Sequence, residues 1–267
     1  MVRRVYKQHT KRKVWLLLLL GVMALAPRFA SAFNWVPSEK QFYLLPIYCK
    51  AKMSQFLRAS PHLRHDLPLL PEGQVREWER MVGPDYLHLH HYCHGTALMS
   101  LAETPAAHRR IEQPRSRRQR YSTKREDLYK RAISEIRYTR SQSRPGRPLW
   151  EAMTLDYAKA LGGAGDRKKA TSVYKELAES YPENPDVWIG YARLMKRSGE
   201  LNAAITILET GLGSSRKKGP LLFWLAQYQY HLGDFTAAAE TAERAEKAGM
   251  KMDRLKRKMG SAAGVAD

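Results

Sequence analysis

Cysteine, membrane-length apolar runs and catalytic motifs are all scarce in this 267-residue sequence. The two cysteines exclude a disulfide-dense miniprotein and a four-cysteine zinc framework. The apolar run Val14–Ala26 is shorter than the ~20 residues that span a bilayer. No GxSxG motif, P-loop or GxGxxG after a strand is present, and no carboxylate pair stands out from ordinary helix charges. The sequence therefore predicts a protein that is not an enzyme and needs no cofactor.

The excess of basic residues is concentrated in two segments of the chain, whose net charge is +20. Residues 1–32 contain seven Lys and Arg and no acidic residue, and residues 103–148 contain 14 Lys and Arg against 5 Asp and Glu. Much of the second excess lies in an expected loop at 103–121. Such a loop could contact an anionic surface or an acidic protein patch, or it could be a solvated linker.

The first 32 residues have the three regions of a secretory signal peptide. Met1–Lys13 is basic, Val14–Ala26 is apolar, and the small residues Ala30 and Ala32 follow Pro27. This order predicts cleavage after Ala32, with an uncleaved membrane anchor as the alternative. We expect an exported protein, in the bacterial periplasm, that meets a membrane only through this segment or the basic loop. Export also argues against nucleic acid as the partner of the basic residues.

Cys49 and Cys93 are the only thiols, and each falls in an expected helix. In an oxidising compartment, a disulfide between them is the favoured interpretation. Two buried reduced thiols and a shared metal site are the alternatives.

A histidine-rich run, residues 88–94, is the strongest candidate for metal chemistry. On a helix, His94 shares a face with His90 and with His91, which is a spacing that can bind zinc or copper. The run lacks a complete metal-binding motif, so the first interpretation is a histidine-rich helix with no metal. A metal-binding protein of the cell envelope, using His90, His91 and His94, is the alternative function.

Glycine and alanine recur every 34 residues in the second half of the chain. Each unit reads as a helix, a turn with a glycine, and a second helix with an alanine near its start. The recurring residues are Gly165, Gly199 and Gly233, then Ala158, Ala192 and Ala226, then Ala170, Ala204 and Ala238.

These units resemble the tetratricopeptide repeat (TPR) family, which has small residues at helix crossings and a glycine at the tight turn. Trp188 stands at the first aromatic position of the middle unit. In the last unit, Leu222 replaces that aromatic residue and Ala242 replaces a large one. The resemblance implies an all-α, right-handed helical-repeat solenoid with three clear repeats.

The remaining residues predict a degenerate fourth repeat and helical caps. Helices are expected at Lys40–Arg58, around Trp78, at 84–102 and at 122–141. The expected divisions are a signal peptide at 1–32, an N-terminal helical cap at 33–83, a degenerate helix pair at 84–148 with the basic loop at 103–121, the three repeats at 151–250, and a cap helix with a frayed tail at 251–267.

In TPR solenoids the first helix of each pair lines the concave face, so the resemblance implies a partner-binding groove there. Apolar pockets beside a basic strip suit an extended protein or peptide segment with acidic side chains or a terminal carboxylate. We expect an exported scaffold or adaptor, in a cell-envelope assembly; solvated helix faces without a ligand are the alternative. The groove residues are Leu155, Lys159, Ile189, Arg193, Lys196, Phe223, Gln227 and Tyr230, with Arg197 and His231 beside them.

Overall fold

The computed structural model of the chain describes residues 35–63, 66–104 and 115–263. The chain divides into two units, Met1–Val36 and Pro37–Asp267, and every helix described below belongs to the second. The expected signal peptide and much of the basic loop lie outside the described residues. Within the described ranges the regular elements are helices without strands, which confirms the all-α prediction. None of these helices combines the length and the apolar character that crossing a membrane requires.

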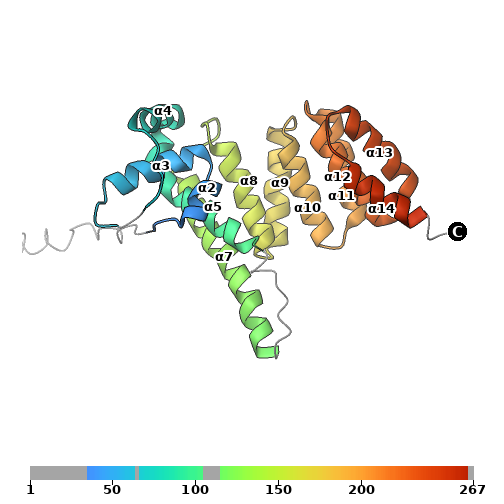
Figure 1. The fold of residues 1–267 in the computed structure, drawn as a ribbon, viewed down its shortest axis with the longest axis horizontal. Helices are drawn as coiled ribbons and strands as arrows, with labels where there is room; N and C mark the ends of the chain where they lie inside the picture. The colour runs from blue at the N-terminus through green and yellow to red at the C-terminus, as the bar shows by residue number, and fades with distance from the viewer. Residues whose placement is uncertain (1–34, 64–65, 105–114, 264–267) are drawn as a thin grey trace, which may run out of the picture. The chain divides into compact units, whose positions relative to one another are not determined.

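Three helix pairs follow one another in chain order and pack side by side (Figure 1). The first helices of successive pairs also touch, α8 with α10 and α10 with α12. We call the exposed sides of these three first helices the inner face. This arrangement confirms the predicted helical-repeat solenoid. The pairs are α8 (Trp150–Gly163) with α9 (Arg167–Ser180), α10 (Pro185–Arg197) with α11 (Leu201–Ser214), and α12 (Lys218–Leu232) with α13 (Phe235–Lys247).

The recurring glycines and alanines have separate physical roles in these pairs. Gly165, Gly199 and Gly233 adopt φ angles of 85°, 83° and 90°, a region that favours glycine. A Cβ at any of them would meet nothing within 4 Å, so the backbone angle and not lack of space requires the glycine. The six recurring alanines are all buried where helices pack, because a small side chain lets two backbones approach.

The degenerate pair consists of α5 (Leu89–Ala102) and α7 (Arg115–Ser141), preceded by a 3₁₀ turn, η1 (Gly83–His88). Gly95 brings the two helices together, since a Cβ there would lie 2.7 Å from Cγ1 of Ile136. Two details differ from expectation. The α-helix begins at Leu89 after the 3₁₀ turn, and α7 begins at Arg115, so residues 115–121 of the expected basic loop are helical.

The N-terminal helices are α2 (Glu39–Leu44), α3 (Ile47–Arg58) and α4 (Glu72–Val82). The prediction of one continuous helix over Lys40–Arg58 was wrong, because Pro46 divides it. Proline lacks the N–H that an interior helix position must donate, and it disfavours the helical region for the residue before it. Leu45 is accordingly extended, and Pro46 becomes the residue before the first turn of α3.

Helix α14 (Asp253–Ala263) packs against the last repeat through Leu255 and the adjacent Met252. Both side chains are almost fully buried among Leu222, Ala226 and Ala242. Leu222 and Ala242, the two residues of the last unit that differ from the family pattern, therefore lie where α14 packs. Smaller residues at these positions leave room for the apolar side chains of the helix.

Candidate functional site

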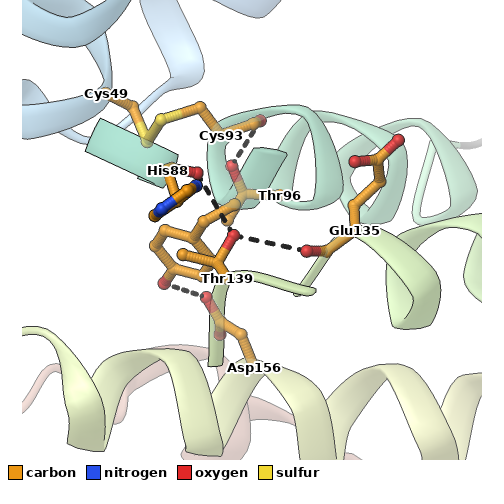
Figure 2. Close-up of a disulfide and its surroundings, with 8 residues drawn as sticks. Cys49, His88, Cys93, Thr96, Glu135, Thr139 and Asp156 are labelled. Carbon is orange, nitrogen blue, oxygen red and sulfur yellow. Dashed lines mark hydrogen bonds between the residues drawn. A yellow bond between two sulfur atoms is a disulfide. The ribbon is translucent and has the colours of Figure 1, made fainter. Parts of the chain in front are cut away.

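A disulfide joins Cys49 of α3 to Cys93 of α5, and both residues are fully buried (Figure 2). Their Cα atoms are 5.4 Å apart, and the structure therefore favours the bond over reduced thiols or a shared metal site. The preceding residue, Tyr92, donates a 2.7 Å hydrogen bond to Asp156 of α8. One turn of α5 is thus linked to α3 by the disulfide and to α8 of the first repeat by the hydrogen bond.

The predicted histidine cluster lies between α5 and α7, where two of its rings share one carboxylate. Nδ1 of His91 lies 2.6 Å from Oε2 of Glu135, and Nδ1 of His94 lies 3.1 Å from Oε1. Burial raises the pKa of Glu135, but hydrogen bonds with His94 and His91 outweigh it, so the net shift is downward. Burial and, next, the neighbouring His91 lower the pKa of His90 to about 4, so its ring stays neutral near neutral pH.

This geometry does not support the alternative metal site at His90, His91 and His94. Over residues 35–63, 66–104 and 115–263, no three His, Cys, Asp or Glu side chains are arranged to hold a metal ion. Two of the histidine nitrogens face Glu135 instead, and the Cys93 sulfur is bonded to Cys49. The cluster links two helices of the degenerate pair.

Five of the eight predicted groove residues line two hollows beside the first helices of the pairs. The first, hollow A, has a volume of about 290 Å³ and contains three predicted residues, Lys159, Ile189 and Arg193. Leu155 is buried in the core beneath the face. The degenerate pair contributes part of the wall, which sequence reasoning did not predict. The residues lining hollow A are Met99, Glu103, Tyr129, Lys159, Tyr174, Asp186, Ile189, Gly190, Arg193 and Arg197.

Two of the five charged residues that line hollow A already have charged or hydrogen-bonding partners. Glu103 accepts a hydrogen bond from Tyr129 and lies 3.9 Å from Arg125. Nζ of Lys159 lies 3.0 Å from Asp156 on its own helix. Arg193 and Arg197 differ, because neither forms an ion pair with a described residue, and both are exposed. They stand four residues apart on α10, so their guanidinium groups share one side of that helix.

The hydroxyl of Tyr174 is a second unusual feature of hollow A. Tyr174 is 1% exposed, and its oxygen has no hydrogen-bond partner among the described residues. It comes from the second helix of its pair, and it reaches hollow A because Gly190 has no side chain; a Cβ there would lie 2.8 Å from the hydroxyl. Burial raises the pKa of Tyr174 more than the nearby Arg197 and Arg193 lower it, so the group remains a hydrogen-bond donor.

The second hollow, hollow B, lies between α12 and α14 and has a volume of about 280 Å³. It contains two predicted residues, Phe223 and Gln227. The predicted Tyr230 packs nearby against the core of the C-terminal cap, and Lys196 lies over the ring of Tyr228; neither lines a hollow. The residues lining hollow B are Phe223, Trp224, Gln227, Lys251, Met252, Arg254, Leu255 and Lys258.

The fold and its inner face define a helical-repeat scaffold, a class that binds partners on extended surfaces. Two profiles of the tetratricopeptide repeat family match this chain, at residues 163–218 and 196–253. These matches identify tetratricopeptide repeats within residues 163–253, and such repeats support a protein or peptide as the partner. Scaffolds of this kind are typically not enzymes.

Two solved structures with similar helices come from proteins called MamA. The chain is 16% identical to "MamA RS-1 ArsTM double mutant", with a TM-score of 0.43 over 75% of this chain and 94% of that one. It is 13% identical to "MamA AMB-1 C2221", with a TM-score of 0.37 over 76% and 97% of the two chains. Scores this low carry no argument about function. No curated protein sequence matches the chain.

Proposed function

We propose that the protein is an adaptor that binds an acidic segment of a partner protein in hollow A. The observation that carries the proposal is the buried hydroxyl of Tyr174, which has no hydrogen-bond partner among the described residues. The guanidinium groups of Arg193 and Arg197, which form no ion pair there, line the same hollow. A buried donor without an acceptor costs about 1–3 kcal/mol. A carboxylate entering hollow A would accept from Tyr174 and pair with Arg193 and Arg197, and charge-assisted bonds of this kind are the strong ones.

The dimensions of hollow A favour a side chain over a free small molecule. At about 290 Å³, hollow A is at the lower limit of the roughly 300–1,000 Å³ typical of small-molecule pockets. Its wall also combines the apolar Met99 and Ile189 with the polar groups. An acidic side chain and its apolar neighbour on an extended segment would use both parts.

Reversing the charges of hollow A is expected to abolish partner capture while leaving the fold intact. In Arg193→Glu/Arg197→Glu, two carboxylates would repel the acidic segment, and both residues are exposed, so the core is unchanged. The measurement is crosslinking in living cells, then affinity capture and mass spectrometry with wild type and variant as baits. Circular dichroism checks the fold.

Lys168→Glu/Lys175→Glu is the matched control, because it makes the same charge change at exposed positions of α9 away from hollow A. A partner lost in the α10 variant and kept in the control supports the adaptor. Tyr174→Phe should weaken capture without lowering stability, since it removes only the hydroxyl that has no partner. Equal capture by wild type and the α10 variant would contradict binding at hollow A.

We also propose that the protein is exported and works in the cell envelope. The signal-like residues 1–32 support this, and a buried disulfide fits an oxidising compartment. Fractionation of cells that express the full chain should place it in the periplasm, with the mature protein beginning at Phe33. Recovery in the cytoplasm with Met1 retained would contradict export.

A further inference from the structure

Hollow B differs from hollow A in having cations from α14 and the segment just before it, beside apolar side chains. Met252 and Leu255 lie beneath it, both almost fully buried, and Phe223 and Trp224 form an aromatic wall. Lys251, Arg254 and Lys258 supply the charge, and no acidic residue lines the hollow. Among the described residues, neither Lys251 nor Arg254 forms an ion pair. The other basic residues of the helix differ: Lys256 pairs with Glu246, and Arg257 does not line hollow B.

The two hollows meet at one pair of side chains. Arg193 lines hollow A, and its guanidinium carbon lies 5.4 Å from the ring centroid of Trp224, which lines hollow B. Further along α12, the pKa of His231 is lowered by burial and then by the nearby Lys196 and Lys258. Positive charges of α10 and α14 therefore converge on the same side of α12, and a single bound segment could contact both hollows.

We propose that α14 is part of the partner-binding surface, and that hollow B takes an acidic residue together with an adjacent aromatic or aliphatic residue of the bound segment. The apolar side chain would pack on Phe223 and Trp224, and the carboxylate would pair with Lys251 and Arg254. This inference rests on the proposed function, because it adds a second subsite to the segment held at hollow A.

A peptide fits hollow B better than an anionic membrane does. A basic helix binds a membrane by burying its apolar face among the lipids. In α14 that face is already occupied, since Leu255 and the preceding Met252 pack into the core of the C-terminal cap. At about 280 Å³, hollow B also accommodates a large side chain and a neighbour better than a drug-sized ligand.

The test begins with selection of phage-displayed random peptides on protein purified from cells that express the full chain. Affinities of the selected peptides are then measured by fluorescence polarisation for wild type and three variants. Lys251→Glu/Arg254→Glu should weaken binding by about tenfold or more, because attractive pairs become repulsive. The matched control, Lys247→Glu/Arg257→Glu, makes the same charge change at exposed positions outside hollow B and should bind as wild type does. The third variant is Arg193→Glu/Arg197→Glu.

The other outcomes show whether the subsite at hollow B fails alone or together with the proposed function. Affinity that falls in the Arg193 variant and stays unchanged in the Lys251 variant would overturn the subsite at hollow B and leave hollow A standing. Affinity unchanged in both, or no enrichment of any peptide, would overturn both proposals. Phosphatidylglycerol vesicles provide the last arm: vesicle binding lost in the Lys251 variant, with no peptide enriched, would assign α14 to lipid.

Discussion

Removing the disulfide, by Cys49→Ala with Cys93→Ala, is expected to destabilise the N-terminal helices by about 4 kcal/mol. The bond closes a loop whose ends are 44 residues apart. In the chain-entropy model, closing a loop of this size lowers the conformational entropy of the unfolded state, which is equivalent to about 4 kcal/mol of stability. The effect should be local. Helices α2 and α3 contact α5, and the repeats pack mainly against their own neighbours.

Hydrogen exchange followed by mass spectrometry is the measurement for this prediction. Backbone amides in α2, α3 and α4 should exchange faster in the variant, whereas those in α10 to α13 should keep their wild-type rates. Reduced wild-type protein is the control, and it should reproduce the pattern of the variant. A uniform increase over all helices, or none, would contradict the local role of the bond.

Trp188→Ala is expected to lower the free energy of unfolding by about 3–5 kcal/mol. The indole is almost fully buried in the core of the repeats, and its Nε1 donates a 2.7 Å hydrogen bond to the carbonyl of Pro182. Truncation therefore leaves both a cavity and an acceptor without its donor. Urea denaturation monitored by circular dichroism gives the change in free energy.

Gly211 provides the matched test of the Trp188 environment. A Cβ at Gly211 would lie 2.5 Å from Cγ of Trp188, so Gly211→Ala alone should cost about 1–3 kcal/mol through overpacking. In the Trp188→Ala background the contact with the indole is gone, but the Cβ of residue 188 would still lie 2.8 Å away, so the same change should cost less than it does in the wild type. Additive effects of the two substitutions would show that the residues do not compete for this space.

The N-terminal half was less accessible to sequence reasoning than the repeats. Helical spacing alone suggested one helix over Lys40–Arg58, and Pro46 overrides that pattern because its effect on the backbone is local. The histidine run suggested a metal site, yet His91 and His94 face Glu135, which is more than 40 residues away in the chain. No spacing rule within the run could indicate that partner.

The candidate site was predicted in part. Repeat register placed Lys159, Ile189 and Arg193 on the face that forms hollow A, since equivalent positions of successive first helices lie on one side of a solenoid. It did not predict Tyr174, which belongs to a second helix and enters hollow A only because Gly190 leaves it space. A glycine inside a helix was the one signal in the sequence, and a close approach is a usual reason for it.

The amino-acid sequence by itself determined the repeat architecture of this protein. A 34-residue period of turn glycines and crossing alanines leaves few alternatives, because each requirement is local to one helix pair. Tertiary packing alone decided which side chains meet at the two hollows. Arg193 against Trp224, and α14 against the last repeat, join residues from different units, and their positions depend on how whole helices pack.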